Sequence, residues 1–324
     1  MLRELVNSNF IMILGVICAF FATYLLHAKL KDKLPHDQGR AFAVEGEKSK
    51  GKARGSGIIF VLVFVVCDLI FNRLSMERSI YMAVVTFSMV TGFLDDMSDK
   101  PWNEYLKGAL DLVLAIIIAV TYLEYNGNTF ILGLAHSKVI TLPYPVYGLL
   151  IVALVWMAIN VTNCSDGVDG LSATLTIITL GSFYLLAEEV SGIGSFEYSI
   201  MLFMVVLAAY LWFNAPPSTI LMGDAGSRAM GVMIAITALM SHSPLLYIPL
   251  SIVLILDGGL GLLKVALLRF LKIRILVNTR CPLHDQARKV SNWSNTQVVM
   301  RFATIQIIVS LVTVWAYWML YQTK

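Results

Sequence analysis

Long apolar runs dominate the chain and predict α-helices that cross a membrane. A membrane-spanning helix needs about 20 mostly apolar residues. The runs here are continuous rather than alternating, which excludes a transmembrane β-barrel. We place ten predicted spans at residues 9–28, 55–72, 79–95, 105–123, 145–162, 170–188, 198–213, 227–242, 244–264 and 298–320.

Composition supports this pattern. Of the 324 residues, 58% are hydrophobic and 14% are charged, against roughly 25% charged residues in ordinary soluble domains. The mean hydropathy is +0.76. These values exclude a soluble enzyme, a disordered chain and a disulfide scaffold. The four cysteines show no pairing pattern, so we predict no disulfide. The expected fold is an all-α polytopic membrane protein, with residues 1–324 forming one membrane domain.

The basic residues predict how the chain is oriented. Ten spans place both termini on one side of the membrane. Of the 24 lysines and arginines, only Arg3, Arg73, Arg78, Lys138 and Lys324 lie on that side, and the other 19 lie in the loops on the opposite side. Because basic residues concentrate in cytoplasmic loops, we predict that the termini are extracytoplasmic.

Three polar loops on the predicted cytoplasmic side carry carboxylates, asparagines and glycines. A charge at the bilayer centre costs roughly 2.5–3.5 kcal/mol on insertion scales, so carboxylates at a membrane face need a reason. The loops lie around residues 92–96, 160–171 and 213–227. Their acids and amides are Asp95, Asp96, Asn163, Asp166, Asp169, Asn214 and Asp224.

This set of residues points to a divalent cation and a phosphorylated ligand. Adjacent acids such as Asp95 and Asp96 repel each other unless a cation lies nearby. Carboxylate and amide oxygens suit Mg²⁺, whereas histidine and cysteine are too sparse for zinc. Glycines let backbone amides approach phosphate oxygens. Turns and helix caps would explain one such loop, but three on one face favour a binding site.

Four ordered blocks carry a resemblance to a known family. They read GFLDD, NVTNCSDGVDGLSA, FNAPPSTILMGDAGSRAMG and PLHDQARKVSNWSNTQVVMRF, and they spread over residues 92–302. The chain resembles the polyprenyl-phosphate N-acetylhexosamine-1-phosphate transferase superfamily. The last block, with Trp293 before 296–302, favours the branch that uses a muramoyl-pentapeptide.

The resemblance implies a fold, a reaction and partners. Members of the family have ten spans, both termini outside and a cytoplasmic active-site cleft. They transfer a phospho-sugar from a uridine-diphosphate (UDP) sugar to undecaprenyl phosphate and release uridine monophosphate (UMP). For this branch the expected reaction is Mg²⁺-dependent transfer of phospho-N-acetylmuramoyl-pentapeptide, which gives lipid I in the bacterial cytoplasmic membrane. The resemblance also implies a homodimer, and we expect no nucleic-acid partner.

The resemblance assigns roles to individual residues. It implies Asp95 and Asp96 as the catalytic pair, with Asp95 as the base, and Asp224 as a catalytic residue and the Mg²⁺ ligand. The residues expected to bind substrate or metal are Asn163, Asp166, Asp169, Asn214 and His284, the last near the diphosphate.

Two departures from the family pattern change the expected contacts. Three consecutive histidines are usual where this chain has His284, Asp285 and Gln286, so we expect Arg280, Arg288 or Lys289 to bind the diphosphate. The usual Thr-Pro-Thr-Met-Gly-Gly segment of the first cytoplasmic loop is also replaced, at residues 50–57. We expect Lys52 or a neighbour of it to contact the nucleotide.

Three further carboxylates lie in or near predicted spans. Asp257 lies inside the ninth span, and carboxylates within the membrane are usually functional, so we expect it in the cleft. We expect Asp68 and Asp111, near span ends, to be solvated or to pack between helices.

Two other functions stay open at this stage. One is a transferase that uses UDP-N-acetylglucosamine as donor with the same lipid acceptor. The other is a cation-coupled transporter, which would place acids through the membrane midplane. The acids here gather at one face, which favours the transferase.

Overall fold

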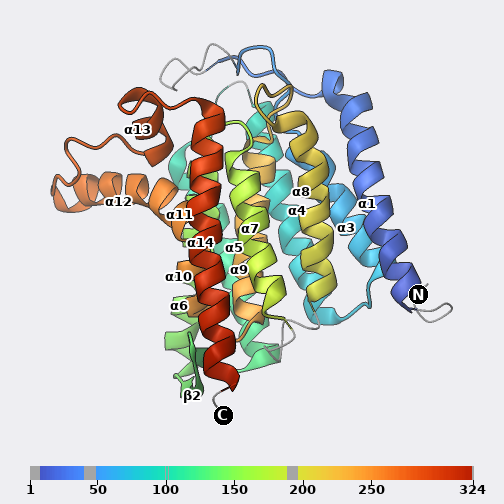
Figure 1. Cartoon of the computed structure of the whole chain (residues 1–324), viewed down its shortest axis with the longest axis vertical. Helices are drawn as coiled ribbons and strands as arrows, with labels where there is room; N and C mark the ends of the chain where they lie inside the picture. The colour runs from blue at the N-terminus through green and yellow to red at the C-terminus, as the bar shows by residue number, and fades with distance from the viewer. Residues whose placement is uncertain (1–7, 40–48, 99, 101, 188–195, 323–324) are drawn as a thin grey trace.

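The fold is a bundle of helices with one β-hairpin (Figure 1). The structure, a computed structural model, describes residues 8–39, 49–98, 100, 102–187 and 196–322. The long helices are α1 (Ser8–Leu30), α3 (Gly57–Phe71), α4 (Met76–Met97), α5 (Glu104–Asn126), α6 (Tyr144–Cys164), α7 (Leu171–Leu185), α8 (Glu197–Asn214), α9 (Gly223–Met240) and α14 (Asn295–Gln322).

Shorter helical segments complete the chain. They are η2 (Lys31–Lys33), η4 (Pro244–Leu246), α10 (Tyr247–Leu250), α11 (Ile252–Leu254), η5 (Ile255–Gly259), α12 (Leu260–Ala266), η6 (Leu267–Leu271) and α13 (Leu283–Lys289). In Figure 1 the first turn of α1 and the last turn of α14 point toward the end of the bundle opposite α13.

Six helices among the described residues are long and apolar enough to cross a membrane, or seven if one bent pair counts as a span. All ten predicted segments are helical over most of their length. However, α3 and α7 have 15 residues each, and α9 carries Asp224 and Arg228. The count of ten and the side of each loop therefore stay predictions. Of the basic residues used to orient the chain, Arg3, Arg40, Lys48 and Lys324 lie outside the described residues.

Helix α9 is the core of the bundle and packs against α3, α4, α6 and α7. Every residue from Asp224 to Met240 is buried, as expected for a helix that is apolar nearly all round. A Cβ atom at Gly92 of α4 would overlap the backbone of Asp224. Small residues allow such close crossings in membranes. Gly92 therefore lets the last turn of α4, with its two aspartates, approach the start of α9.

The ninth predicted segment, 244–264, is broken rather than straight. The axes of Pro244–Leu250 and Ile252–Leu271 differ by 72°, and α12 points away from the bundle in Figure 1. At the break, Gln306 of α14 accepts a hydrogen bond from the Val253 amide (2.9 Å) and donates to the Leu250 carbonyl (3.0 Å). A broken helix within the membrane needs such partners for its freed backbone groups, so the break depends on a residue distant in sequence.

The loop between α5 and α6 forms a hairpin, which corrects the all-helical prediction. Strands β1 (Thr129–Leu132) and β2 (Ala135–Thr141) pair antiparallel. Gly133 in the turn has a φ of +53°, a left-handed conformation that favours glycine. Ser243 Oγ, beyond α9, donates to the Gly133 carbonyl (3.1 Å) and ties the hairpin to the bundle.

Candidate active site

A cavity of about 530 Å³ opens where α9 begins. Residues of the first loop, of the α6–α7 and α8–α9 connections and of the segment near α13 line it together. Six of the ten predicted site residues are in its wall: Lys52, Asn163, Asp166, Asp169, Asn214 and Asp224. The cavity wall thus brings together two of the three polar loops that the sequence placed on one face, at residues 160–171 and 213–227.

Asp224 is one of the acids in the cavity wall. It is the second residue of α9, where the partial positive charge of a helix N-terminus favours a carboxylate. Gly223, which precedes it, has a φ of +68° and leaves no space for a Cβ atom beside the Asp96 carboxylate. Asn163 hydrogen-bonds Asp224 and donates from Nδ2 to Ser227 Oγ (3.0 Å). The last turn of α6 and the first turns of α9 are therefore linked at the cavity.

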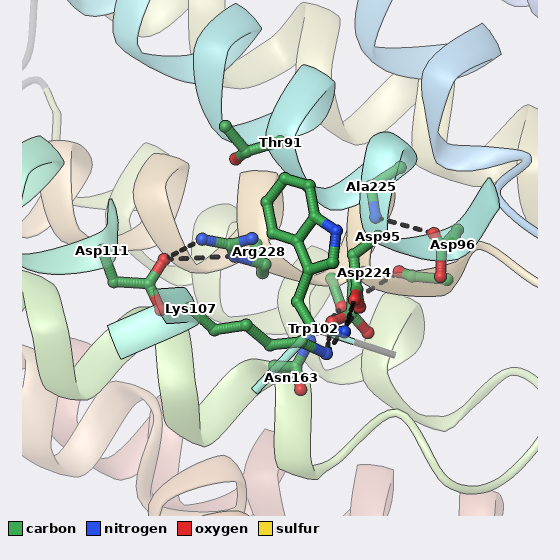
Figure 2. A network of polar contacts seen from close by, with 12 residues as sticks. Thr91, Asp95, Asp96, Trp102, Lys107, Asp111, Asn163, Asp224, Ala225 and Arg228 are labelled. Carbon is green, nitrogen blue, oxygen red and sulfur yellow. Dashed lines mark hydrogen bonds and ion pairs between the residues drawn. The ribbon is translucent and has the colours of Figure 1, made fainter. Parts of the chain in front are cut away.

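Lys107 bridges two of the predicted catalytic acids, as Figure 2 shows. Its Nζ lies 2.5 Å from Asp95 Oδ2 and 3.0 Å from Asp224 Oδ2. The other oxygen of Asp95 accepts a hydrogen bond from the Trp102 amide (2.7 Å). Asp95 is buried and does not line the cavity. Lys107 is not among the predicted site residues, because from the sequence it is only one of the basic residues that indicate orientation.

The side chain of Asp96 also lies behind the wall without exposed surface, and both of its oxygens are engaged. Oδ1 accepts from Arg54 Nε (2.9 Å) and Oδ2 accepts from the Ala225 amide (3.1 Å). Burial alone would lower the pKa of Arg54, but the carboxylates of Asp96 and Asp224 outweigh burial and raise that pKa above its usual range. Arg54 is therefore a permanent cation, and it lines the cavity in front of Asp96.

Lys52 and Asp169 face each other on the far wall. Lys52 Nζ lies 3.2 Å from Asp169 Oδ2 and donates to Ser218 Oγ (2.8 Å). Asn214 is buried between two loops, where it accepts from the Gly170 amide (2.8 Å) and donates to the Ile220 carbonyl (2.8 Å). Its side-chain amide therefore holds the α6–α7 and α8–α9 connections together.

His284 and Asp257 form a buried pair outside the cavity wall. Asp257 accepts from the backbone amide of His284 (2.8 Å), and its Oδ2 lies 2.9 Å from His284 Nδ1. Neither residue is among the described residues that line the cavity. Asp257 therefore contacts His284 and not the cavity. Of the three basic residues expected near the diphosphate, Arg288 lines the cavity, and it bonds Asp285 (2.6 Å).

A second layer of charge lies one helical turn deeper. Arg228, four residues after Asp224 on α9, pairs with Asp111, four residues after Lys107 on α5 (Figure 2). Both side chains are almost fully buried, which contradicts a solvated Asp111 and agrees with packing between helices. Asn160 also donates to Asp111 (3.4 Å).

The donor set suits Mg²⁺ held jointly with a substrate. Among the described residues, no cluster of three or more histidine, cysteine, aspartate or glutamate side chains forms a metal site by itself. Mg²⁺, however, commonly takes one or two carboxylates and completes its shell with water and substrate phosphate. Asp224 and Asn163 offer such oxygens at the cavity wall.

Sequence comparisons agree with this site. The family model described as glycosyl transferase family 4 matches residues 79–242. A phospho-N-acetylmuramoyl-pentapeptide-transferase of Treponema pallidum is 38% identical, over 94% of this chain and 88% of the relative. Enzymes with the same name from Bartonella quintana and Helicobacter acinonychis are 28% and 26% identical, over 86% and 92% of this chain and 85% and 91% of the relatives. The resemblance seen in the sequence is therefore confirmed, and the chain belongs to glycosyl transferase family 4.

Proposed function

We propose that the chain transfers phospho-N-acetylmuramoyl-pentapeptide from its UDP-linked donor to undecaprenyl phosphate, which gives lipid I and UMP. The observation that carries the proposal is the cavity at the head of α9, where Asp224 lies beside Lys107 and Arg54. A wall with carboxylates, amides and cations suits a diphosphate together with a divalent cation. The names of the relatives supply the donor sugar.

The proposed reaction is a displacement at the β-phosphorus of the donor. An oxygen of the lipid phosphate forms a new bond to that phosphorus. The bond from the β-phosphorus to the bridging oxygen breaks, and UMP leaves with the electron pair. Phosphoryl transfer depends mainly on positioning and charge neutralisation, and the cavity residues offer both.

Asp224 and Asn163 are the residues that would hold Mg²⁺. When bound, the ion would neutralise charge on the diphosphate and on the departing UMP. Lys107 holds Asp224 and Asp95 together through one ammonium group. It therefore fixes the last turn of α4 and the first turn of α9 relative to each other.

Asp95 is better suited to orient Lys107 than to act as a base. Its two oxygens are engaged by the Trp102 amide and by Lys107, and its side chain is only 2% exposed. The lipid phosphate also needs little help, because a phosphate monoester with a second pKa near 6 is mostly dianionic at neutral pH. We propose direct displacement, so incubation with donor alone leaves Asp95 and Asp96 unmodified. Detection of a phosphorylated aspartate by mass spectrometry would contradict it.

We also propose that the chain forms ten spans with the cavity on the cytoplasmic side. Nucleotide sugars are cytosolic, and most of the basic residues lie in loops that the ten-span order places with the cavity. Cysteine labelling tests this orientation. Lys289→Cys should react with an impermeant maleimide only after the cells are opened, whereas Lys138→Cys should react in intact spheroplasts.

The donor assay tests the function. Purified protein is mixed with undecaprenyl phosphate, Mg²⁺ and either the UDP-linked muramoyl-pentapeptide or UDP-N-acetylglucosamine, and UMP and lipid product are measured. We expect product from the muramoyl donor and none after chelation with EDTA, with recovery when Mg²⁺ is restored. Product from the N-acetylglucosamine donor alone would reject the proposed donor, and turnover in EDTA would reject the metal requirement.

A further inference from the structure

Arg54 in the first loop covers one of the predicted catalytic acids. Its Nε donates to Asp96 Oδ1 at 2.9 Å. The Arg54 side chain is 19% exposed and lines the cavity, whereas the Asp96 side chain is 0% exposed and does not. At this position the cavity wall therefore presents a guanidinium group, and the carboxylate lies behind it.

Asp96 is fixed from the opposite direction as well. Its second oxygen accepts the Ala225 amide at the start of α9 (3.1 Å). A Cβ atom at Gly223 would overlap the carboxylate, so the backbone encloses it closely. A carboxylate with both oxygens engaged and no exposed surface cannot reach a ligand. It can, however, hold one edge of the guanidinium group.

The backbone around Arg54 is equally constrained. The Arg54 amide donates to the Pro35 carbonyl (2.7 Å), and the Leu221 amide donates to the Ala53 carbonyl (2.7 Å). Ser56 closes the link, because its amide donates to the Leu221 carbonyl (3.1 Å). These bonds attach the first loop to the segment that precedes Asp224. The backbone of Arg54 is therefore held in place before a ligand binds.

The outer edge of the guanidinium group is left for a ligand. In the part of the chain that the structure describes, no hydrogen bond uses Nη1 or Nη2 of Arg54, and the Asp37 carboxylate lies 3.9 Å from Nη1. By contrast, Lys52 is engaged by Asp169 and Ser218. A guanidinium held at Nε presents its two terminal nitrogens as a fork, the geometry that binds two phosphate oxygens.

We propose that Arg54 binds the diphosphate of the nucleotide donor through Nη1 and Nη2, and that Asp96 is a positioning residue that holds Nε. This assignment rests on the proposed function, because it takes a nucleoside diphosphate as the ligand. It gives Asp96 a role through Arg54 in place of direct contact with the reacting phosphates.

Ligand binding tests the assignment without turnover. Affinities of the purified full-length protein for UDP, UMP and uridine are measured by calorimetry, with Mg²⁺ and again with EDTA. We expect Arg54→Gln to weaken UDP binding roughly 10- to 100-fold, the usual worth of hydrogen bonds to a charged group, in both buffers. Uridine, which has no phosphate, should bind as before. Arg269→Gln is the matched control, because this exposed arginine pairs with Glu104 outside the cavity.

Two further variants separate positioning from folding. Arg54→Lys keeps the charge but removes the fork, so UDP affinity should still fall, while thermal unfolding stays close to wild type. Asp96→Asn should weaken UDP binding less than Arg54→Gln does. The double variant should bind UDP no more weakly than Arg54→Gln alone, because Asp96 acts through Arg54.

Three outcomes would overturn the assignment. One is unchanged UDP affinity in folded Arg54→Gln and Arg54→Lys. Another is an equal loss of UDP and uridine binding, which indicates a general structural role. The third is additive loss in the double variant, which removes Asp96 as the positioning residue. The donor assay keeps the proposed function separate. Wild-type turnover with unchanged UDP affinity in the variants rejects only the role of Arg54, whereas a wild type that neither turns over nor binds UDP rejects both.

Discussion

The two ends of α4 each carry a buried cluster of charge, and the clusters differ in balance and access. Near the start of α4, Arg78 lies 3.3 Å from Asp68 of α3, which also accepts hydrogen bonds from Asn72 and Ser199. We call this the closed cluster. At the other end, Asp95, Asp96 and Asp224 meet Lys107 and Arg54, which we call the open cluster. The closed cluster contradicts a solvated Asp68 and agrees with packing between helices.

Charge balance and exposure separate their roles. In the closed cluster the Asp68 and Arg78 side chains are 0% and 8% exposed, and neither lines the described cavity. The open cluster sets three acids against two cations that are 27% and 19% exposed, beside the cavity. A buried ion pair away from the cavity joins the helices that carry it. An excess of acid beside a cavity can take up a further cation and its ligand, which is what the proposed reaction needs.

Removing the central acid should have the largest effect. Asp224→Asn takes away the charge that would hold Mg²⁺ at the cavity wall. The ion supplies several kcal/mol of transition-state stabilisation, so we expect turnover to fall at least about 100-fold. UMP release is measured alongside thermal unfolding. Asp68→Asn in the closed cluster is the control and should keep the turnover of its folded fraction. Equal losses of turnover in both variants would erase the distinction between the clusters.

Lys107→Met should come next. It removes the cation between Asp95 and Asp224, and losing one preorganised charge typically lowers turnover about 100-fold. The freed carboxylates should attract Mg²⁺ more strongly, so half-saturation moves to a lower Mg²⁺ concentration. Lys107→Arg should recover part of the rate. If Lys107→Met keeps wild-type turnover, Lys107 serves only to hold α4, α5 and α9 together.

A substitution in the closed cluster should lower the stability of the protein and leave its turnover unchanged. Arg78→Met leaves the Asp68 carboxylate buried without its cation. Breaking a buried pair on one side destabilises a protein by about 3–5 kcal/mol, so we expect a clearly lower unfolding midpoint in detergent. Turnover per folded molecule should stay at the wild-type value. A loss of turnover with an unchanged midpoint would place function at both ends of α4.

The sequence points to the acids of the open cluster but not to the site role of Lys107, and it does not single out Arg54 among the neighbours of Lys52. Asp95, Asp96 and Asp224 follow apolar runs in glycine-rich segments, a local pattern that can be recognised. Lys107 and Asp224 are 117 positions apart, and Arg54 and Asp96 are 42 apart. Such contacts depend on how helices cross, and apolar periodicity does not specify crossings. From the sequence, Lys107 is only one of the basic residues that indicate topology, and Arg54 is included only as a neighbour of Lys52.

The same reasoning explains which structural predictions held. Helices were recognisable from continuous apolar runs. The break at residue 251 was not, because Gln306 of α14 satisfies the freed backbone groups there. The hairpin was missed although Gly133 marks its turn. Asp257, expected in the cleft, does not line the described cavity and accepts a hydrogen bond from the His284 amide, a contact that depends on where α13 packs.

The smallest net effect is expected at the Arg228–Asp111 pair, between the two clusters. This pair tests whether a buried charge needs access to the cavity to affect turnover. Arg228 and Asp111 lie one turn below the open cluster, yet their side chains are only 2% and 4% exposed. If they join α5 to α9 as a balanced pair, Arg228→Met or Asp111→Leu alone should destabilise by about 3–5 kcal/mol, since each leaves a buried charge. The double variant should return to within about 1 kcal/mol of wild type, because an apolar contact of similar volume replaces the pair.

Turnover decides between the two explanations for the Arg228–Asp111 pair. Lys107 and Asp224 depend on α5 and α9 keeping their spacing, which an apolar pair preserves. The double variant should therefore keep turnover within a few-fold of wild type while both single variants lose stability. A double variant that folds normally but has lost turnover would assign the pair to the electrostatics of the open cluster. In that case access to the cavity would not be the feature that separates functional charge from structural charge in this protein.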